Sequence, residues 1–301
     1  MSNSFNPDLD FEVEYRDDKT SLASRNEFDN ALVSLSNLIA RATTKWSLKE
    51  SKMFLCAVSK IKTRDEQNYV HFSKKDLMEK LNIDPSNKGT IRDTIKKVVF
   101  HSYVQFGTTD SGEWNDGVLL TNFKTTSDDV YIKFNEVYIP LLDELANHFT
   151  MFHLEEILSF NHISSYNLYI YLTSWTQPNY LHQNKKLPKR DIAQVFHLKP
   201  NEYWVTDKKG NTKFHWKNFE TSSLNPAIDD INTLCSEGKT DMRITSCEKV
   251  KKGKTVLGYD FKYVYVDKKT GCPKVLKQSR LLWEKQRSDC GDDIEQSQLP
   301  F

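Results

Sequence analysis

Two stretches of the sequence superpose without a gap: FSKKDLMEKLNI at residues 72–83 and LPKRDIAQVFHL at residues 187–198. The aligned pairs are Lys74 with Lys189, Lys75 with Arg190, Asp76 with Asp191 and Leu77 with Ile192. The same offset places SKMFLCAVSKI (51–61) over YNLYIYLTSWT (166–176), and both are rich in apolar residues at helical spacing. Because two separate matches share one offset, the sequence predicts an internal structural duplication.

The first copy begins with two predicted helices. Apolar residues recur at three- and four-residue steps over residues 32–42, which is typical of one face of an amphipathic helix. The second helix is expected from Ser47 to about Ile61, because S-L-K-E offers a capping box with Glu50.

A strand, two more helices and a sheet are predicted for the rest of the first copy. YVHF (69–72) is a short strand, and Ser73 caps a helix through Leu81 with Asp76 as its box partner. TIRDTIKKVVFHS (90–102) is the next helix. Three segments with strand propensity then follow, namely YVQFG, GVLLTNF and VYIKF.

The second copy repeats this order. FTMFHLEEILSF (149–160) and SSYNLYIYLTSW (164–175) are expected helices, Pro188 stands in the first turn of a third, and a fourth begins near Lys213. The buried side of that fourth helix is predicted to carry Phe214, Phe219, Leu224, Ile228 and Ile231. A hairpin of MRITSCEKV and VLGYDFKYVYV follows, with Lys251-Lys252-Gly253-Lys254 at its tip.

Helices with a helix-turn-helix at their centre, followed by a β-hairpin, form the winged-helix pattern. The predicted fold class is therefore α+β, with two tandem winged-helix domains related by internal duplication. The expected domains are an acidic, disordered extension at 1–28, a first winged-helix domain at 29–147, a second at 148–279, and a flexible tail at 280–301.

Bulk composition favours a globular cytoplasmic protein. The 301 residues suffice for two domains, and 38% of them are hydrophobic. The sequence has no apolar run of membrane-spanning length, and its acidic start differs from a signal peptide. Five cysteines without a C-x-x-C pair are expected to be reduced thiols.

Charge is distributed unevenly although the net charge is only +1. Residues 148–279 carry 20 basic and 13 acidic groups, whereas residues 31–147 carry 16 and 15. Residues 1–30 carry 3 basic and 8 acidic groups. A positively charged second domain is compatible with nucleic-acid binding, and a solvated charged face is the alternative.

Several segments resemble the iteron-binding, theta-type plasmid replication initiators (Rep proteins, RepB/RepA-like) of bacteria. They include SLSNLIARATTKWSLKESKMFL (34–55), YIKFNEVYIPLLDELANHFTMFHLEEIL (131–158), FHWKNFETSSLNPAIDDINT (214–233) and KKGKTVLGYDFKY (251–263). The resemblance implies two winged-helix domains that bind origin repeats as monomers, help to open the origin, and contact host initiator and helicase proteins. It also implies a dimer that represses the initiator's own promoter, thereby controlling plasmid copy number.

Candidate DNA contacts concentrate in the second domain, where phosphate binding needs cations and base reading needs polar side chains on an inserted helix. The fourth helix is expected to present Lys213, His215, Trp216, Lys217, Asn218, Thr221 and Ser222, with Lys213, Lys217 and Asn218 toward base edges. The start of the preceding helix and the wing offer Lys185, Lys186, Lys189, Arg190, Lys249, Lys251, Lys252 and Lys254. An ordinary solvated polar surface is the alternative for both groups.

The first domain offers an auxiliary site and a dimer surface. Lys88, Arg92, Lys96 and Lys97 could form a second, weaker DNA site. Leu32, Leu35 and Ile39 are interpreted either as core residues or, as the resemblance suggests, as part of a dimer surface.

The sequence predicts neither a catalytic site nor a site for a cofactor or metal ion. An origin-nicking rolling-circle enzyme needs a His-x-His pair, and the eight histidines include none. Gly253-Lys254-Thr255 lacks the earlier glycine of a P-loop, since Glu248 stands there. The alternatives to an initiator are a winged-helix transcriptional repressor and, less favoured, such a nicking enzyme.

Overall fold

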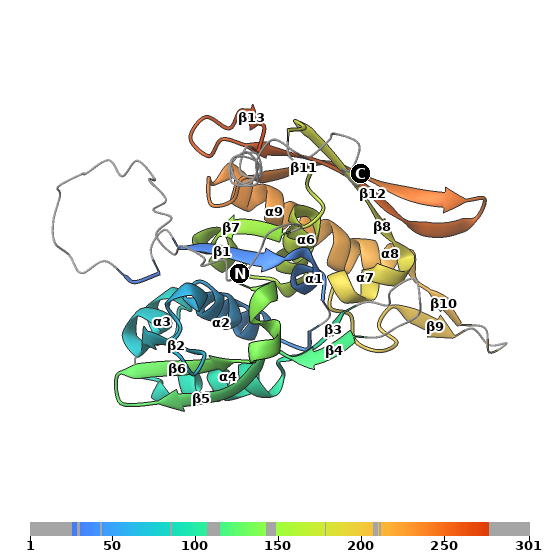
Figure 1. Ribbon diagram of the computed structural model, residues 1–301. Coiled ribbons are helices and arrows are strands. Elements are labelled where there is room, and N and C mark those ends of the chain that lie inside the picture. Colours follow the sequence, from blue (N-terminus) through green and yellow to red (C-terminus); the bar gives the residue numbers. More distant parts are fainter. Residues whose placement is uncertain are drawn as a thin grey trace, which may run out of the picture.

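The computed structural model describes residues 26–28, 31–42, 44–84, 86–106, 115–142, 149–177, 179–206, 210 and 212–276. Two lobes lie side by side, one from the first half of the described chain and one from the second (Figure 1). The predicted extension at 1–28, apart from residues 26–28, and the predicted tail at 280–301 lie outside the described residues, as does the boundary at 147/148.

The first lobe contains helices and short sheets. Its elements are β1 (Leu32–Ser36), α1 (Asn37–Ala40), α2 (Leu48–Val58), η1 (Ile61–Thr63), β2 (Tyr69–Ser73), α3 (Lys74–Lys80), α4 (Lys88–Phe100), β3 (Tyr103–Phe106), β4 (Asn115–Val118), β5 (Leu120–Thr125), β6 (Asp129–Phe134) and η2 (Glu136–Leu141). Strands β2, β6 and β5 form one antiparallel sheet, and β3 pairs with β4.

The second lobe repeats this plan. Its elements are β7 (Phe149–His153), α5 (Leu154–Leu158), α6 (Ile163–Thr173), β8 (His182–Pro188), α7 (Lys189–Val195), β9 (Trp204–Thr206), β10 (Thr212–Phe214), α8 (Trp216–Phe219), the π-helical turn η3 (Glu220–Leu224), α9 (Asn225–Ser236), β11 (Met242–Lys252), β12 (Thr255–Val266) and β13 (Pro273–Lys274). Strand β12 lies between β11 and β8, β13 pairs with its end, and β9 pairs with β10.

The structure confirms the internal duplication. Helices α2 and α6 begin and end 115 residues apart, and so do α3 and α7. This is the offset at which the two sequence matches superpose, so equivalent apolar positions serve equivalent helices.

Two predicted helix starts of the first lobe, at Ser47 and Ser73, are confirmed, with one change of hydrogen-bond partner. Ser47 and Glu50 form the capping box of α2, with 2.9 Å between the Ser47 amide nitrogen and Glu50 Oε2. Ser73 caps α3 by accepting from the Asp76 amide at 3.3 Å. The Ser73 amide donates instead to Glu27 Oε1 at 2.7 Å, so a distant carboxylate replaces Asp76 in the predicted box.

Two predicted helices are wrong in part because strands β1 and β7 pair with each other. Residues 32–36 form a strand and only residues 37–40 are helical, where a helix over 32–42 was expected. Residues 149–153 are likewise a strand, and α5 begins only at Leu154. The antiparallel register runs from Leu32 opposite His153 to Ser36 opposite Phe149. Backbone hydrogen bonds between these two strands thus outweigh the helical tendency that the spacing of the apolar residues indicates.

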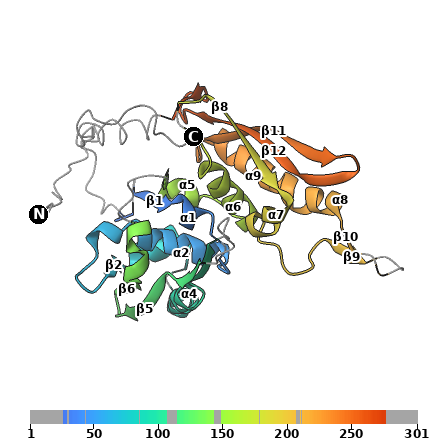
Figure 2. The ribbon, with the colours of Figure 1, turned by 45° about the vertical axis from the view of Figure 1, so that its right-hand side comes forward.

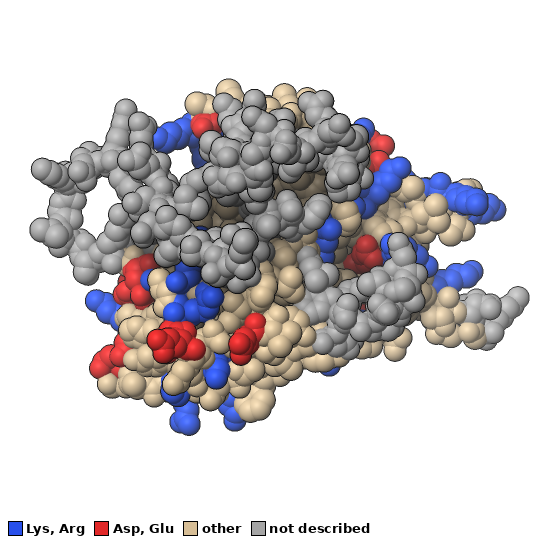
Figure 3. All heavy atoms as spheres, viewed as in Figure 1, with Lys and Arg blue, Asp and Glu red and all other residues tan. Residues whose placement is uncertain are grey.

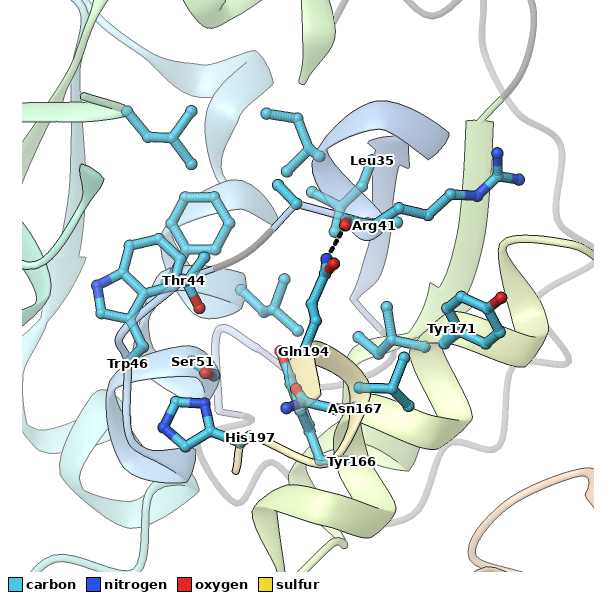
Figure 4. Close-up of a pocket in the computed structure, with 18 residues that line it drawn as sticks. Leu35, Arg41, Thr44, Trp46, Ser51, Tyr166, Asn167, Tyr171, Gln194 and His197 are labelled. Atoms are coloured by element: carbon cyan, nitrogen blue, oxygen red, sulfur yellow. Dashed lines mark hydrogen bonds between the residues drawn. The ribbon is translucent and has the colours of Figure 1, made fainter. Parts of the chain in front are cut away.

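The β1–β7 pair belongs to a broader junction between the lobes. Lys52 Nζ of α2 donates to the carbonyl oxygens of Leu158 and Phe160, at 2.7 and 2.5 Å. The Arg41 guanidinium donates to Ser174 Oγ at 3.0 Å, and Gln194 donates its side-chain amide to the Arg41 carbonyl (Figure 4). A cavity of about 70 Å³ lies at this junction.

One continuous hydrophobic core joins the lobes. Phe54, Phe134, Phe160 and Phe219 are all buried in it. Leu35 and Ile39 are only 3% and 7% exposed and belong to this core, which was one of their two predicted roles, while Leu32 is 41% exposed.

Candidate nucleic-acid interface

The segment α8–η3–α9 is continuously helical from Trp216 to Ser236 and corresponds to the predicted fourth helix. Pro226 lies inside it and has no N–H to donate to the carbonyl four residues earlier, while its ring would clash with that carbonyl. The helix widens just before this proline, where the Asn225 amide donates to the Glu220 carbonyl five residues back. We call residues 216–236 the recognition helix.

The recognition helix has one buried and one exposed side. Phe219, Leu224 and Ile231 are buried as predicted, and Ile228 is half-buried beside them. Phe214 is half-buried too, but it lies on strand β10 and not on the helix, where it was predicted. The exposed side carries the polar residues Lys217, Asn218, Thr221 and Ser222. These are four of the seven residues that the sequence assigned to this helix.

Lys213, His215 and Trp216 have other positions than expected. Lys213 lies on strand β10, so the expectation that the helix begins near Lys213 is wrong. His215 is the N-cap, and its Nδ1 accepts from the Asn218 amide at 3.3 Å. Trp216 is half-buried against Phe214, with ring centroids 4.7 Å apart. His215 therefore separates strand β10, which ends at Phe214, from the helix, which begins at Trp216.

The hairpin β11–β12 is the predicted wing, and its tip is basic. Gly253 adopts φ +59° at the turn, a left-handed conformation that glycine takes without steric cost. The side chains of Lys251, Lys252 and Lys254 around it are exposed. Within the described part of the chain, none of these ammonium groups has a carboxylate within 4.0 Å, and the same is true of Lys217. The charges are therefore available to phosphate groups.

Lys249 differs from the lysines at the wing tip. Its Nζ lies 2.5 Å from Glu220 Oε1 of the recognition helix, and both side chains are mostly buried. The Tyr259 hydroxyl of β12 donates to the same carboxylate oxygen at 2.6 Å. This contact fixes the wing to the recognition helix.

The basic residues before and at the start of α7 divide into two environments. Lys186, Lys189 and Arg190 are exposed, the first on β8 and the other two in the first turn of α7. Lys185 of β8 is half-buried, with Nζ 3.0 Å from the centroid of the Trp175 ring. Burial, aided by the charge of Arg41, lowers the pKa of Lys185 to about 8.

The first lobe presents a weaker counterpart of this surface. Arg92, Lys96 and Lys97 are exposed on α4, while the side chain of Lys88 lies outside the described residues. The β5–β6 turn contains Asp128, and Asp129 begins β6, where the second lobe has lysines at the tip of β11–β12. Negative charge at this turn disfavours contact with phosphates.

The basic side chains project together in space. On the right of the molecule, two prongs carry Lys and Arg side chains, and a gap separates them (Figure 3). The ribbon identifies the upper prong as β11–β12 and the lower one as β9–β10, with α8 between them (Figure 1). In the view turned by 45°, α8 again lies between the two hairpins (Figure 2).

The described residues show neither a metal-binding cluster nor a membrane-spanning helix. No group of three or more His, Cys, Asp or Glu side chains there could hold a metal ion. None of the helices that the structure describes combines the length and apolar character needed to span a bilayer.

A helix-turn-helix with an exposed polar recognition helix and a basic wing defines a DNA-binding protein of the winged-helix class. The chain belongs to the replication initiator family. The family model described as "Initiator Replication protein, WH1" matches residues 32–173, and "Initiator Rep protein, WH2" matches residues 191–263. The predicted family and the fold of two winged-helix domains are thereby confirmed.

Two solved structures resemble this chain, and the first of them supports the fold. The Pi initiator protein, determined in complex with iteron DNA, is 16% identical, with a TM-score of 0.58 over 79% of this chain and 98% of that chain. Domains 2 and 3 of RctB, as a selenomethionine derivative, are 12% identical, with a TM-score of 0.43 over 74% of this chain and 84% of that chain. No curated protein sequence matches the chain significantly.

Proposed function

We propose that this protein initiates plasmid replication by binding the direct repeats of an origin sequence-specifically, with the second winged-helix domain as the main DNA-binding unit. The observation that carries the proposal is the set of exposed cations and polar groups around the recognition helix. Lys217 and Asn218 lie at its exposed start, and the hairpin β11–β12, with exposed lysines at its tip, extends beyond α8 (Figure 1).

Each group has a defined task in this proposal. The recognition helix enters the major groove, where Asn218 pairs with an adenine edge and Lys217 donates to a guanine edge. Lys186, Lys189 and Arg190 bind the backbone that the preceding helix crosses, and Lys251, Lys252 and Lys254 bind phosphates beside the groove. Thr221 and Ser222 add hydroxyl donors near the groove wall.

The first domain is assigned a supporting role. Exposed Arg92, Lys96 and Lys97 on α4 bind about one helical turn (~34 Å) away in the monomer. The acidic turn at Asp128 supports the view that this contact is the weaker one. In a dimer the first domain would pair with a second copy, and exposed Leu32 is a candidate for that surface.

The protein acts without catalysis in this proposal. Binding at successive repeats bends the origin, and the added contacts offset the cost of deformation, which helps an AT-rich stretch to open. Host initiator and helicase proteins are then recruited in the cytoplasm. A dimer bound upstream of the gene would repress its own promoter.

Footprinting of the purified protein on the DNA around its own gene tests the proposal. We expect protection at regular intervals over direct repeats, with affinity that falls steeply with salt. The double variant Lys217→Ala with Asn218→Ala should lose about 1–3 kcal/mol of specific binding for each base contact removed. Its fold should be unchanged, because both side chains are exposed.

The matched control is Lys269→Ala with Thr270→Ala. Both residues are exposed on the turn between β12 and β13, at the opposite end of β12 from the wing tip. Equal affinity of the two double variants, or protection without a repeating pattern, would contradict the proposed function.

A further inference from the structure

The hairpin β9–β10 is an addition to the second winged-helix unit. Helices α3 and α7 start at Lys74 and Lys189, 115 residues apart, whereas α4 and α8 start at Lys88 and Trp216, 128 residues apart. The connection between the two helices of the helix-turn-helix is therefore 13 residues longer in the second unit, and it contains β9 and β10. The first unit has no equivalent between α3 and α4 in its described residues.

This hairpin is fixed to the recognition helix. Aromatic rings join its base to the helix, since Phe214 packs against Trp216 and Phe219 with centroids 4.7 and 5.6 Å apart. The His215 amide donates to the Tyr203 carbonyl at 2.7 Å, and the Tyr203 hydroxyl lies 2.8 Å from Ser223 Oγ. These contacts attach the base of the hairpin to the recognition helix.

The outer part of the hairpin combines a cation with exposed apolar surface. Lys213 is exposed opposite Val205 in the strand register, and Val205 and Trp204 are 51% and 43% exposed. Within the residues that the structure describes, no carboxylate lies within 4.0 Å of the Lys213 ammonium. Lys189 Nζ lies 5.5 Å from the Trp204 ring centroid, so a second cation stands against the same hairpin.

We propose that β9–β10 is a second wing that contacts the sugar-phosphate backbone of the DNA duplex bound by the recognition helix, on the side opposite β11–β12. The inference rests on the proposed function. Three observations support DNA as the occupant: the position of α8 between the two hairpins (Figure 1), the cations on both (Figure 3), and the attachment of β9–β10 to the helix. Lys213 binds a phosphate, and Trp204 and Val205 cover the adjoining sugars.

Salt titrations of DNA binding by the full-length chain test the second wing. Each phosphate contact contributes about 0.9 to the slope of log K against log salt concentration. Lys213→Ala should therefore lower the slope by about 0.9 and the affinity about fivefold at 0.15 M salt, equally for specific and scrambled DNA. The footprint should also shorten at one end only. Lys269→Ala is the single-charge control.

The outcomes separate this inference from the proposed function. An unchanged slope and footprint for Lys213→Ala, combined with loss of specific binding in the Lys217→Ala and Asn218→Ala double variant, overturns the second wing alone. Unchanged binding in all of these variants overturns both proposals. If Trp204→Ala and Lys213→Ala bind DNA normally, the exposed hairpin serves another partner and the inference is wrong.

Discussion

Glu220 of the recognition helix and Lys249 of the wing form an ion pair with 2.5 Å between Oε1 and Nζ, and their side chains are only 24% and 27% exposed. The same carboxylate accepts a hydrogen bond from Tyr259. Burial and this hydrogen bond raise the pKa of the Tyr259 hydroxyl, which keeps it protonated as the donor.

Replacing Glu220 should therefore weaken the attachment of the wing to the helix. Glu220→Ala leaves the Lys249 ammonium and the Tyr259 hydroxyl without an acceptor, which should cost about 1–3 kcal/mol in the free energy of unfolding. Urea denaturation measures this change. Glu237→Ala is the control, because its ion pair with Lys239 is solvent-exposed and such pairs contribute about 0–1 kcal/mol. If both variants lost the same free energy of unfolding, the contact between the helix and the wing would contribute no more to stability than an exposed ion pair.

The stability of the second lobe should depend on the ionisation of Lys185. Its pKa is about 8 in the folded protein against 10.5 for an ordinary lysine, so between these values the unfolded chain binds more protons than the folded one. This lysine thus makes the free energy of unfolding rise with pH across that window, and its charge destabilises the fold below pH 8. Lys185→Met should remove this dependence.

Denaturation at a series of pH values from 7 to 10 checks this prediction. We expect the variant Lys185→Met to be more stable than the unaltered protein near pH 7. This difference in the free energy of unfolding should become smaller as the pH rises above 8. Lys186→Met, an exposed neighbour on the same strand, controls for general effects of removing a lysine. A pH-independent difference for Lys185→Met would refute the role of its charge.

The repeated parts of the fold could be predicted because local signals and the duplication agreed. The caps at Ser47 and Ser73 and the alternation in β6 are signals within a short stretch of chain, and the offset of 115 residues repeats the helix signals in the second lobe. Strand β1 could not be found this way. Its partner β7 lies more than 100 residues further on, and its own apolar spacing also fits a helix.

The sequence predicts which exposed residues of the helix and the wing tip form the candidate site, but not the hairpin β9–β10 or the partners of the buried lysines. Lys217, Asn218 and the lysines of the wing tip are exposed where the winged-helix pattern places them. The sequence pattern predicts Lys213 on the helix, whereas it lies on β10 of a hairpin that the pattern of helices does not indicate. The signal that could have revealed it is the sequence WVT and TKF on either side of D-K-K-G-N, which is typical of two strands and a turn. The partners of Lys185 and Lys249 come from distant strands and helices, so no local pattern indicated them.

Gly258 should be the least replaceable residue of β12. It adopts φ +151°, and a Cβ atom there would lie 2.1 Å from the carbonyl oxygen of Leu187 on the paired strand β8. Backbone cannot yield as a flexible side chain does, so Gly258→Ala should separate β8 from β12 locally and cost about 3 kcal/mol or more. Thermal and urea unfolding measure the loss.

Gly253→Ala supplies the matched comparison, because Gly253 also has a positive φ, of +59°, but nothing lies within 4 Å of its added Cβ. Only the cost of the left-handed conformation, about 1–2 kcal/mol, is expected there. Since β8 connects directly to α7, Gly258→Ala should also displace Lys189 and Arg190 and weaken DNA binding at every salt concentration. Gly253→Ala should leave these residues in place and disturb only the tip of the wing. If both variants lost the same stability, the close approach of β8 to β12 would have no part in holding the DNA-binding face together.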